Sequence, residues 1–392
     1  MIVEASSEER ERLVADFVRL CEIESPSGDE RAMADAVTEE LRTLGLEVEE
    51  DDTAEETEAG AGNLLARLPA PEGAPTVLLC AHIDTVPLAA PVQVQRADGI
   101  LTNRHEAILG ADNKAAVATV LGAARRLAKD GSPAGVELLF TTSEERALRG
   151  AKAFDRGRLG ADYGYVFDHA SPIGEVVVAS PTYYRLAASF RGQAAHAGIR
   201  PEAGANAIAA AAAAIARMQI GRIDDETTAN VGRIEGGTAA NVVAERCDIE
   251  LEARSLDDAR AGEAVSELVD ACAEAASDGG CDLDTSVERL FRGYRLTRTA
   301  PAVETAAAAL EACGIEPAYI PSGGGSDANA FIADGFQCLN LANGTDRNHQ
   351  PDESVSEHAL EQLLDVALAL VHASADAEPA EWGLPAEPPT PT

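Results

Sequence analysis

Positive charge is scarce in this sequence. It has 31 Lys and Arg residues against 67 Asp and Glu, for a formal net charge of −36. Its lysines are Lys114, Lys129 and Lys152, and all other basic side chains apart from histidine are arginine. A field of this sign repels phosphate backbones and anionic lipid. The composition therefore argues against binding to nucleic acid or to a membrane surface.

Several sequence signals of secreted and membrane proteins are also missing. The seven cysteines are scattered without a C-x-x-C pair, and Cys80 lies in an apolar run where a buried, reduced thiol is expected. The alanine-rich run at Ala207–Ala216 is too short to span a bilayer. The first residues, MIVEASSEERERLV, lack the basic and apolar regions of a signal peptide. We therefore expect a reduced, soluble, cytoplasmic protein.

At 392 residues the chain exceeds the usual size of one domain, so two domains are expected. Short apolar runs at 76–81, 136–141 and 163–167 indicate buried strands, and 114–129 indicates a helix between the first two. This alternation is typical of an α/β domain with a mixed, largely parallel sheet. From about residue 182 the pattern changes to the order β-α-β-β-α-β, which predicts a ferredoxin-like α+β layer.

After Tyr294 the α/β pattern resumes, so a lid domain interrupts the catalytic domain. The predicted catalytic, metal-binding domain covers residues 1–182 and 295–376, and the predicted lid domain covers 183–294. Residues 377–392 are rich in Pro, Ala and Glu and are predicted to be a disordered tail.

Side chains that can bind metal follow the predicted strands. His82 and Asp84 follow the first, the Glu144–Glu145 pair follows the second, and Asp168 ends the third. His349 follows a later apolar run, and Asp112 precedes a helix. In an open α/β sheet, ligands bind outside the carboxyl ends of the strands, so these groups are expected at one edge.

Imidazole and carboxylate groups without thiolates suit zinc or a similar divalent ion. The candidate ligands are more than one ion requires and fit two ions that share a bridging carboxylate: His82, Asp112, Glu145, Asp168 and His349. Two such ions can bridge a water molecule, lower its pKa to roughly 7 and stabilise a developing oxyanion. Glu144 beside Glu145 supplies a carboxylate that is free to act as a base, and Asp84 is placed to orient His82.

The chain resembles a known family in these residues and the segments around them. Four motifs, in order, are similar to those of the co-catalytic zinc peptidases that include peptidase T, carboxypeptidase G and the aminoacylases: His82–Pro87, Leu109–Asp112, Thr142–Glu145 and Ala195–Gly198. The segments Ser322–Asn329 and Ala195–Glu202 resemble the peptidase T branch most. The resemblance runs to about residue 372.

The resemblance implies that His82 and Asp168 hold one zinc ion, that Glu145 and His349 hold the other, and that Asp112 bridges them. Cobalt or manganese could replace zinc. The resemblance further implies a dinuclear metallohydrolase that cleaves small peptides, specifically a tripeptide aminopeptidase. It also implies a homodimer formed through the lid.

The resemblance also assigns the remaining roles. Glu144 would be the general base, Asp84 would orient His82, and His196 would stabilise the oxyanion, often in the partner subunit's site. Four residues would bind substrate: Asn241, Arg254, Gly324 and Gly325. The chain departs from the family at Asn113, often acidic there, at Ala147, often glycine, and at His169, where a small residue is common.

Other functions stay open from the sequence. A carboxypeptidase or an N-acyl-amino-acid deacylase would use the same metals and base. The run Gly324–Ala328 approximates a nucleophile elbow, so a serine hydrolase using Ser326 is a second chemistry. That hypothesis leaves the acids and imidazoles at the strand ends without a role. An inactive, dimeric binding module would require a lost ligand or base, and none is lost.

Overall fold

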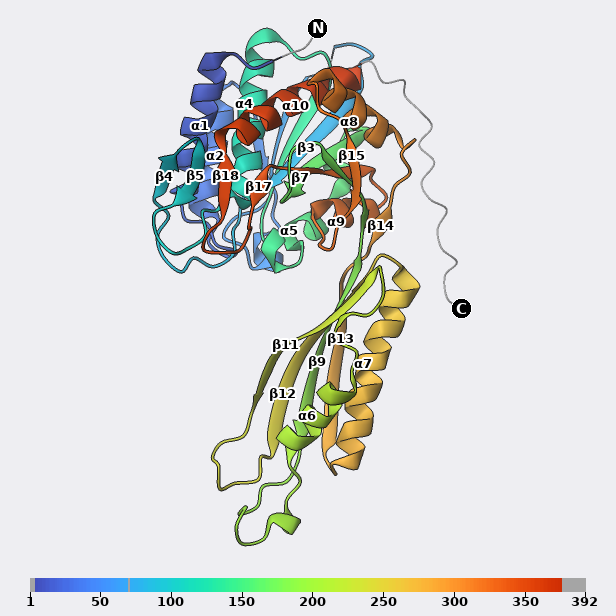
Figure 1. Cartoon of the computed structure of the whole chain (residues 1–392). Helices are drawn as coiled ribbons and strands as arrows, with labels where there is room; N and C mark the ends of the chain where they lie inside the picture. Colours follow the sequence, from blue (N-terminus) through green and yellow to red (C-terminus); the bar gives the residue numbers. More distant parts are fainter. Residues whose placement is uncertain (1–3, 70, 376–392) are drawn as a thin grey trace. The chain divides into compact units, whose positions relative to one another are not determined.

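The computed structural model describes residues 4–69 and 71–375 (Figure 1). The predicted disordered tail at 377–392 lies outside the described residues. The chain divides into two compact units. The first comprises the residues up to Val178, Leu296–Ser322 and the residues from Ser326 onward; the second comprises Ala179–Arg295 and Gly323–Gly325. Within the described residues, no helix is long and apolar enough to cross a membrane.

Most of a nine-stranded mixed sheet belongs to the first unit. Its order is β1-β2-β6-β3-β7-β16-β8-β14, with β15 also paired to β8. The four central strands β6, β3, β7 and β16 are parallel, and the flanking pairs are antiparallel. The strands are β1 (Val48–Glu50), β2 (Leu64–Leu68), β3 (Thr76–His82), β6 (Gly135–Thr141), β7 (Tyr163–His169), β8 (Glu175–Ser180), β14 (Tyr294–Arg295), β15 (Ala318–Pro321) and β16 (Cys338–Ala342). The predicted α/β architecture is confirmed.

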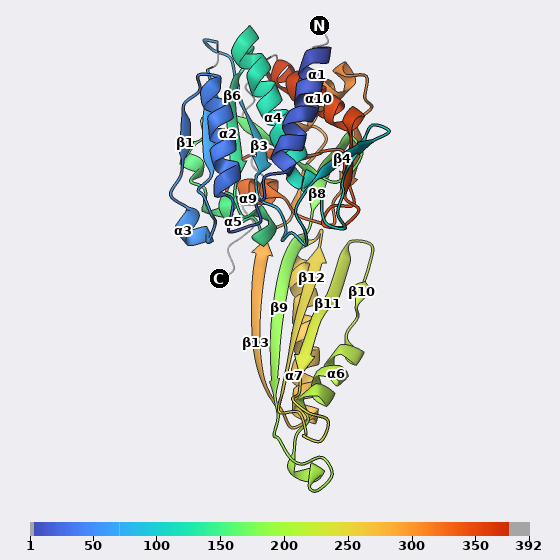
Figure 2. The same ribbon diagram turned by 90° about the vertical axis from the view of Figure 1, so that its left-hand side faces the viewer.

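Helices pack on both faces of this sheet (Figures 1 and 2). The longer ones, α1, α2, α4, α8 and α10, join the main hydrophobic core, while α9 packs on β7 and β16 from the other face. Alternation along β3 explains the two layers, since Val77 and Leu79 belong to that core whereas Leu78 does not. The helices are α1 (Ser7–Cys21), α2 (Arg31–Thr43), α3 (Ala54–Thr57), α4 (Ala111–Asp130), α5 (Arg149–Ala153), α8 (Pro301–Ala312), α9 (Asp327–Ala333) and α10 (Glu357–Ala375).

A small antiparallel sheet, in the order β17-β18-β5-β4, accompanies the large one. Its strands are β4 (Val94–Ala97), β5 (Ile100–Asn103), β17 (Thr345–Asp346) and β18 (Ser354–Ser356). The turn between β17 and β18 carries His349, so this sheet fixes both ends of the segment that presents a predicted metal ligand.

The second unit has the predicted β-α-β-β-α-β order with one additional short strand. Its five-stranded antiparallel sheet runs β10-β11-β12-β9-β13, and α6 and α7 pack on it. The side chains of β9 that face these helices are Leu186, Ala188 and Phe190. Arg185 and Arg191 occupy the alternate positions, on the other face of the sheet. The elements are β9 (Thr182–Arg191), α6 (Ala207–Arg217), β10 (Gly221–Arg222), β11 (Thr227–Gly236), β12 (Arg246–Ser255), α7 (Asp258–Asp278) and β13 (Asp282–Phe291).

Candidate active site

The first unit brings the predicted metal ligands and Glu144 together at one edge of the large sheet. His82 is the last residue of β3, Asp168 lies near the end of β7, and Asp112 is the second residue of α4. Glu144 and Glu145 form a short 3₁₀ turn that follows β6. Because β3, β6 and β7 are parallel neighbours, their carboxyl ends lie side by side.

The carboxylate of Asp112 faces two histidines. Its Oδ1 lies 3.3 Å from His82 Nε2, and its Oδ2 lies 3.3 Å from His349 Nε2. Donor atoms that share one zinc ion lie about 2.0–2.1 Å from it and therefore roughly 3.3 Å from one another. Each oxygen of Asp112 is thus spaced from one histidine nitrogen as two ligands of a common ion would be.

The other carboxylates complete two groups of donors. His82 Nε2 also lies 3.4 Å from Asp168 Oδ1, and His349 Nε2 lies 2.8 Å from Glu145 Oε1. Potential ligand atoms of His82, Glu144 and Asp168 all lie within 4.8 Å of one another, as do those of His82, Asp112 and Glu145. These two groups share His82, and Asp112 of the second group also lies 3.3 Å from His349 Nε2. Such an arrangement fits two neighbouring divalent ions.

The electrostatics of this cluster also favour cations. Burial raises the pKa of Glu144 well above its ordinary value, and the nearby Asp168 charge raises it further. Burial raises the pKa of Asp168 and of Glu145 in the same way. Asp112 differs, because hydrogen bonds with His349 and His82 overcome the effect of burial and lower its pKa. Buried carboxylates that repel one another are stabilised as anions when metal ions lie between them.

Asp84 is fully buried behind these residues and accepts several hydrogen bonds. Its Oδ1 accepts from the backbone N–H of Glu144 at 3.0 Å, and its Oδ2 accepts from the backbone N–H of Glu145 at 3.2 Å. Ser27 Oγ donates to Oδ2 at 2.6 Å. His82 Nδ1 lies 3.0 Å from the Asp84 backbone oxygen and 3.4 Å from Oδ1. Asp84 therefore contacts the predicted histidine ligand and also both members of the glutamate pair.

The turn that carries the glutamate pair has an unusual backbone. Ser143, Ala147 and Leu148 have φ values of 49°, 65° and 62°, in the left-handed region that favours glycine. At Ala147 this conformation suits the glycine that the resemblance to the zinc peptidases leads us to expect there. Ser143 Oγ donates to the buried Glu30 carboxylate at 3.0 Å, which helps to hold the strained turn in place.

The other predicted residues lie in the second unit, at two separate places. His196 and Asn241 lie on adjacent segments, where Ala197 N donates to the Asn241 oxygen at 2.9 Å and His196 forms a β-bridge with Val242. His196 is exposed, and its Nδ1 accepts from Gly198 N at 3.2 Å.

Arg254 lies near the other end of β12, beside the glycine segment. Its guanidinium donates to the Gly323 oxygen at 3.3 Å and stacks 4.0 Å from the ring centre of Tyr183. It also pairs with Glu252 at 3.0 Å. The Gly324 oxygen accepts from Ser180 Oγ at 3.0 Å. Arg254 therefore contacts the segment that contains the predicted Gly324 and Gly325. His196 and Asn241 lie instead near the segment that precedes β12.

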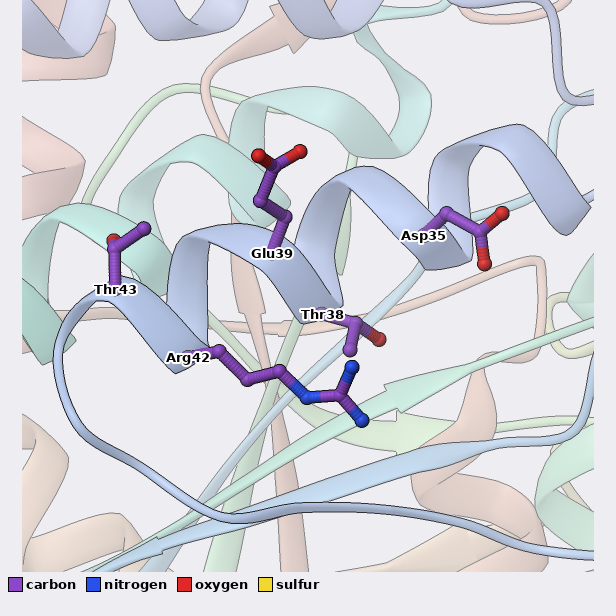
Figure 3. Close-up of a pocket in the computed structure, with 5 residues that line it drawn as sticks. All are labelled: Asp35, Thr38, Glu39, Arg42 and Thr43. Atoms are coloured by element: carbon purple, nitrogen blue, oxygen red, sulfur yellow. The ribbon is translucent and has the colours of Figure 1, made fainter.

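Two other features of the first unit do not form a competing site. Ser326 is only 1% exposed at the start of α9, so its hydroxyl is not presented as a nucleophile elbow requires. A surface pocket on α2 is lined by residues of that helix alone, which are Asp35, Thr38, Glu39, Arg42 and Thr43 (Figure 3). No residue of the metal-binding cluster lines this pocket.

Sequence patterns missed several residues that support the cluster. Ser27 and Glu30 precede the first strands, and Glu353 follows His349 by four positions. Their contacts join segments far apart in the chain: Glu353, for example, accepts from the backbone N–H of Gly110 at 2.8 Å, 243 positions away. No local pattern of hydrophobic residues indicates such partners.

Comparison with known proteins agrees with this geometry. A model of the peptidase family M20/M25/M40 matches residues 78–373, a range that includes every predicted metal ligand. The chain belongs to this family. The M20 peptidase is 36% identical over 365 residues to the Bacillus subtilis (strain 168) protein YqjE, with 93% of this chain and 98% of YqjE covered.

Two solved structures of peptidases resemble this M20 peptidase over nearly its whole length. The aminopeptidase PepT from Bacillus cereus ATCC 10987 is 39% identical, with a TM-score of 0.84 and coverage of 93% of this chain and 99% of that one. A tripeptidase from Staphylococcus aureus subsp. aureus Mu50 is 32% identical, with a TM-score of 0.89 and coverage of 94% and 99%. This M20 peptidase is therefore a metallohydrolase of the peptidase T type, with a candidate site for two metal ions.

Proposed function

We propose that this M20 peptidase is a two-zinc aminopeptidase that removes the first residue of tripeptides. The observation that carries the proposal is the position of Asp112 between His82 and His349, with each carboxylate oxygen 3.3 Å from one imidazole nitrogen. The similarity to an aminopeptidase PepT and to a tripeptidase supports the substrate class.

In this proposal His82 and Asp168 hold one ion, Glu145 and His349 hold the other, and Asp112 bridges them. Zinc suits this set of nitrogen and oxygen donors, and cobalt or manganese are alternatives. When bound, the two ions would make a water molecule acidic and polarise the scissile carbonyl. Nitrogen–oxygen distances of 2.8–3.4 Å within the cluster support the assignment of ligands.

Glu144 is the proposed general base. It would accept a proton from the attacking water and later donate it to the leaving amine. Its position suits both steps, because its carboxylate lies within 4.8 Å of potential ligand atoms of His82 and Asp168, next to the proposed ions. Asp84 would hold Glu144 in position through the backbone N–H at 3.0 Å.

Arg254, Gly324 and Gly325 are proposed to bind the peptide. A guanidinium suits a substrate carboxylate or carbonyl, although Arg254 must share its donors with Glu252 and the Gly323 oxygen. Asn241 and His196 are proposed to bind the peptide and stabilise the oxyanion from the other end of the lid sheet.

The length of β12 supports a dimer in which each lid serves the partner's site. Asn241 precedes β12 and Arg254 is its ninth residue, so nearly the whole of a ten-residue strand separates them. The eight steps from the first to the ninth residue of a strand span roughly 27 Å. A tripeptide is too short to contact both ends, so His196 and Arg254 of one chain would serve different substrates. We therefore propose a homodimer formed through the lid and, given the seven free cysteines, a cytoplasmic location.

The proposal is tested by metal content and by a peptide panel. Two zinc ions per chain, with activity lost on chelation and restored by zinc, would support the metal site. Hydrolysis of free tripeptides at the first bond would support an aminopeptidase. Cleavage of N-blocked dipeptides alone would instead favour a carboxypeptidase or deacylase. Activity that survives complete removal of metal would overturn the proposal.

A further inference from the structure

Glu353 links two predicted metal ligands that come from different parts of the chain. It follows His349 by four positions and immediately precedes β18. Its carboxylate side chain is only 1% exposed. The turn between the two residues is closed by hydrogen bonds from Glu353 N to the Gln350 oxygen at 3.0 Å and from Gln350 N to the Arg347 oxygen at 3.1 Å. Glu353 is therefore fixed relative to His349.

The buried carboxylate accepts three backbone N–H groups from the segment that carries Asp112. Oε2 accepts from Leu109 at 2.7 Å and from Gly110 at 2.8 Å, and Oε1 accepts from Asp112 itself at 2.8 Å. Gly110 has a φ of 75°, so the segment bends here before α4 begins. The backbone of Asp112 is thus held by Glu353, four residues after His349. The carboxylate of Asp112 lies between His349 and His82.

We propose that Glu353 is a positioning residue for the two-metal site: it fixes Asp112 relative to His349, so that one carboxylate can bridge two ions. This inference rests on the metal ligands proposed above. Because Asp112 serves both ions, a small displacement of its backbone would change the geometry at both. Groups behind the ligands typically contribute roughly 10–100-fold to metal affinity or activity.

The alternative is that Glu353 only stabilises the fold, as a negative charge at the start of α4. A glutamine substitution separates the two possibilities. Glutamine keeps the size of the side chain, but it has one acceptor oxygen and an NH₂ group. In either orientation Glu353→Gln leaves an NH₂ group facing a backbone N–H, at Asp112 or at the pair Leu109 and Gly110.

Glu137 provides a matched control. It is also buried, at 3% exposed, and it also accepts backbone N–H groups, from Gly160 at 3.0 Å and Ala161 at 2.9 Å. Its partners lie outside the metal cluster, so Glu137→Gln measures the general effect of neutralising a buried carboxylate. Both variants would be compared with the wild type by thermal unfolding, by competition with a chelator for Zn²⁺, and by the visible absorption of the Co²⁺-loaded protein.

We expect Glu353→Gln to weaken the binding of at least one Zn²⁺ by roughly 10–100-fold and to change the Co²⁺ spectrum. Glu137→Gln should lower the unfolding temperature without altering either metal readout. If Glu353→Gln does not fold, Glu353→Asp carries the same test, because it keeps the charge but shortens the reach to the three amides.

A folded Glu353→Gln or Glu353→Asp protein with wild-type Zn²⁺ affinity and an unchanged Co²⁺ spectrum would overturn the role of Glu353. An equal loss of affinity in Glu137→Gln would also overturn it, since the effect would then be general. Both outcomes are distinct from failure of the proposed function, in which the wild type itself would bind no Zn²⁺.

Discussion

The carboxylate of Asp84 accepts a hydrogen bond from the backbone N–H of Glu144 at 3.0 Å. Through its second oxygen it also accepts from Glu145 at 3.2 Å, so one buried side chain holds the proposed base and a proposed ligand on the same turn. The turn is strained at Ser143 and Ala147, with φ values of 49° and 65°. Hydrogen bonds from outside the turn are therefore needed to keep it in this conformation.

We predict that Asp84→Asn lowers kcat by roughly 10–100-fold while the protein stays folded. Asparagine cannot accept from both backbone amides, since its NH₂ group would face one of them. The measurement is kcat and KM on a tripeptide, together with the unfolding temperature. Ser27→Ala is the matched control, because it removes one hydrogen bond to Asp84, of 2.6 Å, and leaves both amide contacts. A larger loss of kcat in Ser27→Ala would contradict this explanation.

A second prediction concerns acid stability at the first helix. Glu9 caps α1 together with Ser6 and accepts a hydrogen bond from Arg126 Nε at 2.5 Å. The Arg126 hydrogen bond lowers the pKa of Glu9 to about 2, with burial opposing it. A depressed pKa stabilises the fold above the ordinary value of 4.5, and this stabilisation is lost as the pH falls through about 2.

Glu9→Gln should therefore unfold at a lower temperature than the wild type near neutral pH, and the difference should shrink as the pH falls from about 5 toward about 3. Thermal unfolding across that range measures it. Glu8→Gln, in the same turn of the helix, controls for the loss of one negative charge at the helix start. A difference between Glu9→Gln and the wild type that stays constant with pH would show that the ion pair is not its source.

Local patterns in the sequence predict much of the fold. They do not predict the hydrogen bonds that support the site. Buried apolar runs predicted β3, β6 and β7, and the polar residues after them predicted the edge where His82, Glu145 and Asp168 lie. The small sheet was missed because its strands have only two to four residues, too few to show a period.

Long-range hydrogen bonds set the limit of prediction at the site itself. Asp84 and Glu353 accept from backbone N–H groups 60 and 243 positions away, at Glu144 and Gly110. Every residue except proline supplies such a donor, whatever its side chain. The sequence therefore predicts which side chains are capable of binding metal, but not which buried carboxylates hold the segments that carry them.

A third prediction concerns the glycine segment of the second unit. A Cβ atom at Gly325 would lie 2.7 Å from Cε2 of Phe291, closer than real Cβ atoms come to a neighbouring ring. Gly325→Ala should therefore displace Phe291, which packs against Tyr183 with ring centres 5.4 Å apart, and should destabilise the protein by roughly 1–3 kcal/mol.

Gly323→Ala is the matched control, because a Cβ there meets no atom within 4 Å. Peptide hydrolysis should fall in Gly325→Ala, with a raised KM, while Zn²⁺ binding stays at the wild-type level. Denaturant unfolding and chelator competition on both variants measure these effects. Equal behaviour of the two alanine variants would show that the close approach to Phe291 is unimportant.

The last prediction distinguishes the two adjacent glutamates. Glu144 lies within 4.8 Å of His82 and Asp168 and has the spacing of a ligand, although we propose that it is the base. Glu145 lies 2.8 Å from His349. Glu144→Gln should lower kcat by roughly 10²–10⁴-fold and retain two Zn²⁺ ions, because a base contributes to proton transfer and not to metal affinity. Glu145→Gln should lose one ion and recover part of its activity at high Zn²⁺ concentration. Metal content and kcat measured on both proteins decide the assignment: a Glu144→Gln protein with one ion would make Glu144 a ligand and leave the base to be sought elsewhere.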